Sequence, residues 1–235
     1  MTLNNSNIFE KKVAVIQSNY IPWAGYFAVM ASVDLFVVYE CVQYTKNDWR
    51  NRNQILEIDG RLRWLSIPIR QYSMHQNFMD TRVSHREWAQ SHYNILRQRF
   101  SRTYGWILWQ DDIKILYEKA SQLNYLFEIN RLFLKWTTRA LGITTEIAFL
   151  DTYPIYDDPN ERLISILKDF GANRYLSGPA AKSYLNPLRF NEMKIDLNYV
   201  NYNELIGNVF GTSEPAKPTS ILQSIFEANH EFRCH

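Results

Sequence analysis

Polar and aromatic side chains follow two short apolar runs near the start of the chain, where they could bind an anionic ligand. The apolar runs are residues 13–16 and 35–39. Lysine and arginine bind phosphate or carboxylate, asparagine amides recognise polar groups, and indole rings stack on flat ligands. The candidate binding residues are Gln17, Asn19, Tyr20, Trp23, Gln43, Lys46, Asn47, Trp49, Asn51, Arg52 and Asn53, with Arg50 as a further positive charge.

Both segments also have a purely structural interpretation. The first could be a turn with Trp23 in the core, and the second could be a solvated charged loop. Ligand binding is favoured because Gln17, Asn19 and Tyr20 in close succession are unusual for a simple turn. In the second segment Trp49 lies among charged residues, which is unusual for a plain linker.

A third candidate segment begins at the end of a later expected strand, residues 174–177. It contains Ser177, Gly178 and Lys182. In α/β folds, loops that contact phosphate follow the carboxyl ends of strands. The alternative is a Gly-Pro turn that starts a helix.

Two residues could act as the acid or base of a reaction. Glu40 follows the second apolar run, and His85 precedes a segment with helical spacing. A carboxylate or an imidazole can accept a proton from an attacking amine. The alternative for His85 is a surface histidine or one satisfied by internal hydrogen bonds. The sequence has no zinc-site spacing, nucleophile elbow, Walker loop or dinucleotide fingerprint, so we predict no bound metal.

The elements that position these residues can be read from hydrophobic spacing. Residues 13–16, 26–32 and 35–39 form a βαβ pattern, and the carboxyl ends of its parallel strands meet at one edge. Further expected strands are 54–59 and 61–69 around an Asp-Gly turn, 144–150, 174–177 and 195–202. Further expected helices are 84–103, 107–120, 122–141, 160–170 and 220–229.

This order of elements predicts an α/β fold with a parallel-stranded, Rossmann-type sheet. Residues 1–12 are expected to be a flexible N-terminal arm. Residues 13–235 are expected to form a single α/β domain, with a helical lobe at about 84–142. Helical insertions are common where a lid closes over a site.

Composition limits the class of protein. The net charge of +2 gives no strong field for nucleic acid, and aromatic residues reach 15%, which suits either a large core or a stacking site. Two cysteines are typical of a reducing compartment. The polar start lacks the apolar core of a signal peptide, and no apolar run is long enough for membrane insertion. We therefore expect a cytoplasmic protein, and the oligomeric state cannot be read from the sequence.

Four stretches together resemble the WbqC-like family. They are QSNYIPWAGYF, DLFVVYECVQYTKNDWRNRNQI, RWLSIPI and YLSGPAAKSYL, and the resemblance extends over roughly residues 12–229. The family's first motif usually reads His-Gln-Pro-Asn-Tyr-Leu-Pro-Trp, where this chain has Ile16 and Ser18 in place of the histidine and first proline. In the second motif, Glu40 and Cys41 stand where the family usually has two aspartates.

The resemblance implies a place in bacterial O-antigen and other surface-polysaccharide gene clusters. Some members have been labelled glycine transferases that act on amino sugars. A more distant likeness to pantothenate synthetase and related adenylating enzymes implies a nucleotidyltransferase-like sheet. The histidine pair with which those enzymes bind ATP phosphates has no counterpart in the first loop of this chain.

From this resemblance we expect an enzyme that N-acylates an amino sugar carried on a nucleotide, using an acyl or aminoacyl donor. No tightly bound cofactor is expected. Activation by ATP with Mg²⁺ and activation through an acyl carrier both remain open. The alternative is a non-catalytic accessory module that binds sugar or nucleotide in the same pathway.

Overall fold

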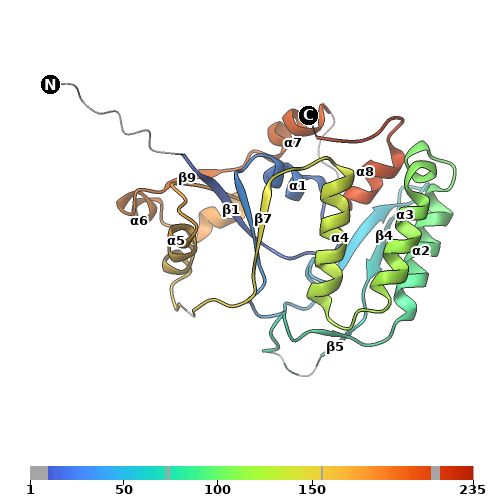
Figure 1. Cartoon of the computed structure of the whole chain (residues 1–235), viewed down its shortest axis with the longest axis horizontal. Helices are drawn as coiled ribbons and strands as arrows, with labels where there is room; N and C mark the ends of the chain where they lie inside the picture. Colours follow the sequence, from blue (N-terminus) through green and yellow to red (C-terminus); the bar gives the residue numbers. More distant parts are fainter. Residues whose placement is uncertain (1–9, 72, 74, 155, 213–217, 235) are drawn as a thin grey trace.

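A five-stranded parallel sheet organises the structure, a computed structural model that describes residues 10–71, 73, 75–154, 156–212 and 218–234 (Figure 1). Its strands are β1 (Lys12–Gln17), β2 (Leu35–Tyr39), β7 (Glu146–Leu150), β8 (Arg174–Ser177) and β9 (Asp196–Tyr199). Their order is β7-β2-β1-β8-β9, and every neighbouring pair is parallel. The expected α/β fold with a parallel sheet is confirmed. Most of the expected arm, residues 1–9, lies outside the described residues.

The order of the strands reverses direction between β1 and β8. From β1 the chain adds strands outward through β2 to β7, and it then returns to place β8 and β9 on the other side of β1. This is the arrangement of Rossmann-type sheets, in which ligands bind outside the carboxyl ends of the strands at the reversal.

Apolar side chains of the central strands alternate between two cores, one on each face of the sheet. Val13 and Val37 pack with α5 (Pro159–Asp169) and α6 (Pro187–Glu192). Ala14 and Val38 belong to the larger core, which includes α1 (Ala24–Ala31) and α7 (Tyr202–Phe210). Because both faces are covered, these strands are almost continuously apolar.

The connection from β2 to β7 carries the helical region. Its helices are α2 (Glu87–Phe100), α3 (Tyr104–Ala120) and α4 (Leu126–Ala140), within the range expected from helical spacing. Two antiparallel strand pairs precede these helices: β3 (Arg52–Leu56) with β4 (Leu62–Ser66), and β5 (Ile69–Arg70) with β6 (Arg82–Val83). The first hairpin turns at Gly60, whose φ of +83° suits glycine. Helix α8 (Ile221–Glu227) packs on α3.

In the last third of the chain one expected strand was too long, and helices α6 and α7 were not expected. The predicted strand 195–202 ends at Tyr199, and Tyr202 instead begins α7, which ends at Gly211 with a φ of +64°. Gly207 interrupts the middle of this helix and weakens its signal in the sequence. Helix α6 was not predicted, because its six residues are too few to display a helical period.

A hydrogen-bonded chain of buried side chains joins the loop after β1 to the helical region. The Tyr20 hydroxyl lies 2.9 Å from His92 Nδ1 and 2.9 Å from the Tyr117 hydroxyl. Tyr20 is fully buried and His92 is nearly so. Burial lowers the pKa of His92 to about 4, so this imidazole is neutral in the folded protein at pH 7.

His92 should make the protein less stable in mild acid. Its folded pKa of about 4 lies below the reference value of 6.5, so the unfolded chain binds the extra proton first and stability falls as pH drops from 6.5 to 4. The full effect is about 3 kcal/mol. Urea unfolding at several pH values should show that the difference between the wild type and His92→Gln depends on pH in this window. Parallel pH curves would contradict the assignment.

Candidate functional site

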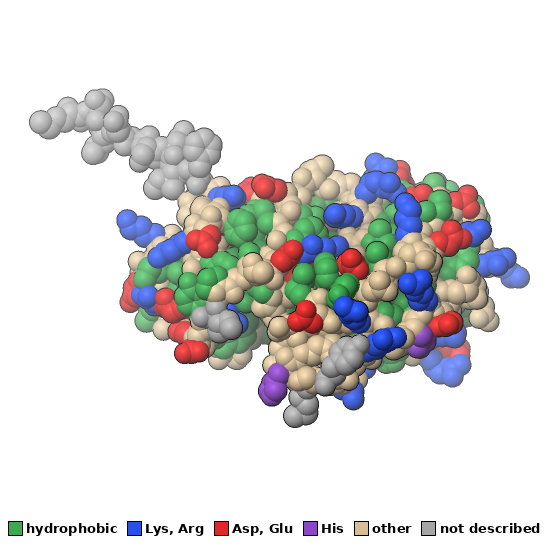
Figure 2. All heavy atoms as spheres, turned by 60° about the horizontal axis from the view of Figure 1, so that its bottom comes forward, with side chains coloured by type: hydrophobic (Ala, Val, Ile, Leu, Met, Phe, Trp, Pro, Cys, Tyr) green, Lys and Arg blue, Asp and Glu red, His purple; other side chains and the backbone are tan. Residues whose placement is uncertain are grey.

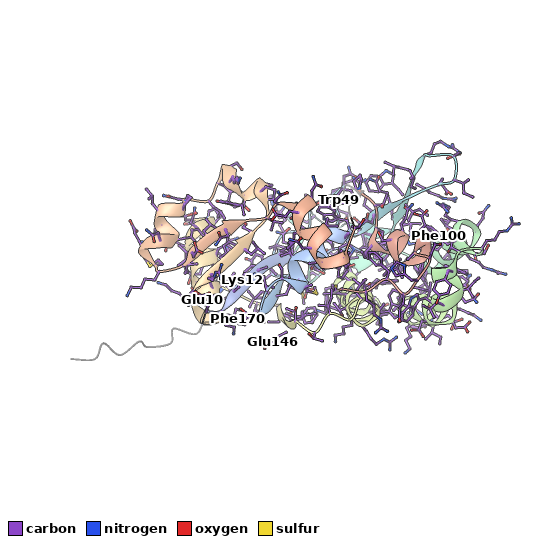
Figure 3. All side chains as sticks on the ribbon, turned by 90° about the horizontal axis from the view of Figure 1, so that it is seen from above. Glu10, Lys12, Trp49, Phe100, Glu146 and Phe170 are labelled. Atoms are coloured by element: carbon purple, nitrogen blue, oxygen red, sulfur yellow. The ribbon has the colours of Figure 1, made fainter. Side chains whose placement is uncertain are left out.

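A crevice opens at the reversal point because β1 and β8 pair only at their amino ends. Their register contains two residue pairs, Lys12 with Arg174 and Val13 with Tyr175, whereas β1 and β2 pair along five. The strands leave a cavity of about 520 Å³ between them, which we call the switch-point cavity. Gln17, Tyr39 and Ser177 bring the carboxyl ends of β1, β2 and β8 to its wall. Figure 3 shows Trp49, another wall residue, well away from the amino ends of the strands at Lys12 and Glu146.

Two arginines from different parts of the chain line the switch-point cavity. The Arg50 side chain is nearly buried, lies 3.4 Å from Asp48 and donates to Asn19 Oδ1. Burial lowers the pKa of Arg50, and Asp48 partly offsets this. Arg162 on α5 donates to the Tyr156 carbonyl. In both guanidinium groups, Nε is buried without a hydrogen-bond acceptor among the described residues.

The backbone around the cavity also suits an anion. Gly178 follows β8 and precedes the short 3-10 helix η1 (Pro179–Ser183). A Cβ atom at Gly178 would lie 3.1 Å from the Tyr202 hydroxyl, so a larger residue would crowd the cavity wall. The first residue of α5, Pro159, also lines the cavity, so the positive end of that helix dipole lies nearby.

A second cavity adjoins the first. We call it the indole pocket, and it has a volume of about 310 Å³. Its walls are Trp23, Trp49, Pro22, Pro218 and the amides of Asn19 and Asn53. Asn19 and Trp49 also line the switch-point cavity, so the two cavities share a partition.

A broader depression, with a volume of about 750 Å³, lies along the β3–β4 hairpin and α2. Each of its arginines is already paired: Arg61 with Asp59 at 2.6 Å, Arg63 with Glu57 at 3.0 Å, and Arg99 with Glu227 at 2.5 Å. These pairs are closer than the 3.4 Å contact of Arg50 with Asp48, and Arg162 has no carboxylate partner among the described residues, so the switch-point cavity offers more to an anion.

Eight of the residues expected from the sequence line one or both cavities. They are Gln17, Asn19, Trp23, Trp49, Arg50, Asn53, Ser177 and Gly178. Asn53 is nevertheless buried and structural, because its amide donates to the Ile21 carbonyl at 2.9 Å and accepts from the Gln54 amide at 2.8 Å.

Tyr20 is corrected from a ligand-stacking residue to a core residue. Its ring makes edge contacts with Trp88 and Phe133, and its hydroxyl is held by His92 and Tyr117. A buried tyrosine hydroxyl needs such partners, and these lie far along the sequence.

Asn51 and Arg52 hold the loop in place and do not line either cavity. Asn51 accepts from Tyr44 at 2.9 Å and donates to the Ile67 carbonyl at 2.8 Å. Arg52 donates to the side chain and backbone of Asn47, whose φ of +62° is left-handed. The Arg52 guanidinium also lies over the Trp64 ring, 4.4 Å from its centre.

The remaining expected binding residues also lie outside the two cavity walls. Gln43, Lys46 and Asn47 are exposed, and the backbone of Gln43 forms an isolated antiparallel β-bridge with Asn77. Lys182 is exposed, with its ammonium 5.2 Å from the centre of the Tyr199 ring. Lys46 and Lys182 are therefore not the cations of these cavities.

Neither of the expected acid–base residues lines these cavities. Glu40 has no exposed surface, and its Oε2 accepts from Arg131 Nε at 2.7 Å. Burial raises the pKa of Glu40, although Arg131 acts in the opposite direction. Arg131 also pairs with Asp151, which is exposed, so Glu40 is the buried member of an ion-pair network that reaches the surface. His85 is exposed and pairs with Glu87 at 3.0 Å.

Several residues that line the switch-point cavity were not expected from the sequence. Asp48 lies between two expected binding residues, Asn47 and Trp49, but nothing in the sequence around it indicated a catalytic or binding role. Arg162 comes from α5, and the crossover that brings this helix to the cavity is visible only once the strand order is known. Tyr39 is the last residue of β2, as expected, but its ring gave no sign of a site; Tyr202 was expected in a strand and instead begins α7.

Two further kinds of feature are absent from the described residues. No group of three or more His, Cys, Asp or Glu side chains in the described part of the chain is arranged to hold a metal ion. No described helix is long and apolar enough to span a membrane. On the face seen in Figure 2, basic and acidic side chains are interspersed among apolar ones.

The fold and the cavity define an α/β protein with a Rossmann-type sheet and an arginine-lined crevice at its switch point. The chain belongs to the WbqC-like protein family, which matches residues 17–208. It is similar to the uncharacterized protein Rv1507c of Mycobacterium tuberculosis (strain ATCC 25618 / H37Rv). The two are 36% identical over 224 residues, which cover 94% of this chain and 95% of the relative. No solved structure matches the chain.

Proposed function

We propose that this protein is an enzyme of bacterial surface-polysaccharide (O-antigen) biosynthesis that N-acylates an amino sugar carried on a nucleotide. One observation carries the binding part of the proposal. The switch-point cavity contains two arginines whose buried Nε atoms lack acceptors among the described residues. A diphosphate supplies several charged acceptors and suits such a pair. The amino sugar and the acyl donor rest on the family resemblance.

The reaction needs a group that takes a proton from the sugar amine, and we assign this to Asp48. Its carboxylate lines the same cavity as the two arginines and is partly exposed. The amine nitrogen attacks the acyl carbonyl carbon, a C–N bond forms, and the bond from that carbon to the leaving group breaks. Asp48 accepts the amine proton and returns it to the leaving group.

For the activated donor we favour an acyl or aminoacyl thioester over an adenylate made from ATP. Adenylating enzymes of related fold bind ATP phosphates with two histidines in the first loop. This chain has Ile16 and Ser18 around Gln17 instead. A thioester brings its activation with it, so the protein would need to position only the two substrates.

Asp48→Asn should lower the acylation rate by about 100-fold or more, because asparagine cannot accept the proton. Mass spectrometry should detect the product after incubation of purified protein with nucleotide-linked amino sugars and acyl or aminoacyl thioesters, with and without ATP and Mg²⁺. We expect one amine hydrogen to be replaced by an acyl group, free thiol to be released, and ATP to have no effect.

Asp111→Asn is the matched control, because Asp111 is an exposed aspartate on α3 that lines neither cavity. It should leave the rate unchanged. Absence of acylated sugar with every donor, while the nucleotide sugar still binds, would refute the enzyme and favour an accessory binding module. Full activity in Asp48→Asn would refute the role of Asp48.

A further inference from the structure

We propose that the indole pocket binds the base of the nucleotide, while its diphosphate lies against Arg50 and Arg162 in the switch-point cavity. The inference rests on the proposed function in one respect, because it takes the ligand of the larger cavity to be a nucleotide. It goes further by assigning a second compartment and by naming the chemical class of group that enters it.

The first wall of the indole pocket is a tryptophan fixed on two sides. A Cβ atom at Gly25 would lie 2.3 Å from the Trp23 ring, so the indole is folded directly over the glycine. The ring of Tyr202 meets Trp23 edge-on, with a centre-to-centre distance of 4.7 Å. Trp23 is therefore held in position before any ligand arrives.

The second wall is the first ring of a short stack. Trp49 lies 5.6 Å from Trp64, with 31° between the ring planes, and Arg52 covers Trp64. Trp49 is 41% exposed, a large fraction for an indole. Its backbone is fixed on both sides, since its carbonyl accepts from the Tyr20 amide at 3.0 Å and its own amide donates to Asp48 at 2.7 Å. An exposed but supported indole is a suitable stacking surface.

The polar groups of the pocket favour a base over a sugar ring. The Asn53 amide is already used in internal hydrogen bonds. Asn19 accepts from Arg50 through Oδ1, and its side-chain NH₂ donates to no acceptor among the described residues. A pyranose needs partners for several hydroxyl groups. A base needs mainly apolar faces and a donor for a ring carbonyl or nitrogen, which Asn19 supplies.

The two compartments are arranged so that one ligand can occupy both. Asn19 and Trp49 form their common wall, and Trp23 of the pocket touches Tyr202 of the cavity. The Arg50 guanidinium donates a hydrogen bond to Asn19 Oδ1 at this wall. A nucleotide therefore has stacking rings on one side of the partition and guanidinium groups on the other.

Calorimetric titration can separate recognition of the base from recognition of the diphosphate. The probes are inorganic pyrophosphate and the diphosphates of uridine, thymidine, cytidine, guanosine and adenosine. In the wild type, at least one nucleotide should bind at least about tenfold more tightly than pyrophosphate. Trp49→Ala should weaken that nucleotide by about tenfold or more and weaken pyrophosphate by much less, because Trp49 borders the diphosphate compartment but stacks on the base. Trp49→Phe should retain most of the affinity.

Gly25→Ala provides an independent test, because it should displace the Trp23 ring and cause the same selective loss. Tyr104→Ala removes an aromatic ring of similar exposure, 51%, from α3 and should change neither affinity. Equal binding of pyrophosphate and all nucleotides, equal loss of both in Trp49→Ala, or no binding of any probe would overturn the inference. Selective nucleotide binding without any acylated product would overturn the proposed reaction and leave this inference standing.

Discussion

Arg162→Ala should weaken binding of both inorganic pyrophosphate and the preferred nucleoside diphosphate by about 100-fold, with little change in folding stability. Charge-assisted hydrogen bonds to a guanidinium contribute about 1.5–3 kcal/mol each, and a diphosphate can accept two from one arginine. Within the protein, the Arg162 side chain donates to the Tyr156 carbonyl from a partly exposed position. The loss should therefore appear in affinity and not in thermal melting.

The matched control is Arg189→Ala, which removes an arginine that pairs with Glu161 of α5 outside the cavity. Its affinities should equal those of the wild type. The effect of Arg162 should also shrink at high salt, because part of it is screened electrostatic attraction. Unchanged affinity in Arg162→Ala, or a large fall in melting temperature alone, would show that the guanidinium serves the fold.

The second large effect is expected at Glu40. Glu40→Ala should lower the free energy of unfolding by about 3 kcal/mol, because it leaves Arg131 without its buried partner and removes packed volume. Glu40→Gln should cost less than about 1 kcal/mol. Glutamine keeps an oxygen that accepts from Arg131, and Asp151 still pairs with that guanidinium.

Urea unfolding and activity measured on the same samples decide the role of Glu40. A buried structural carboxylate predicts that Glu40→Gln retains acylation activity. A general base predicts a stable protein whose activity falls by about 100-fold or more. The second outcome would restore the catalytic role suggested by the sequence and remove it from Asp48.

Local patterns in the sequence were sufficient for most of the fold. Apolar runs located β1 and β2, the Asp-Gly pair located the turn at Gly60, and β8 was predicted with its observed bounds. Helix α7 was not predicted, because Gly207 weakens the helical signal of the sequence and Tyr202 suits a strand equally well. The conformation of such a segment is determined by packing against distant parts of the chain, which a short window of sequence does not contain.

The site was predicted in outline. The predictions that failed have one physical cause: the contacts that decide a residue's role come from distant parts of the sequence. Strand ends brought Gln17 and Ser177 to one cavity because parallel strands end at the same edge. Tyr20 resembles a ligand contact until His92, which is 72 positions away, is placed beside it. Arg162 resembles an ordinary helix residue until the β7–β8 crossover carries it to the cavity.

The most direct test is a crystal structure of the protein soaked with the nucleoside diphosphate that binds most tightly in calorimetry. We predict electron density for the diphosphate between Arg50 and Arg162, beside the carboxyl ends of β1 and β8, and density for the base between Trp23 and Trp49. Density in the depression along the β3–β4 hairpin and α2, with the switch-point cavity empty, would contradict the account.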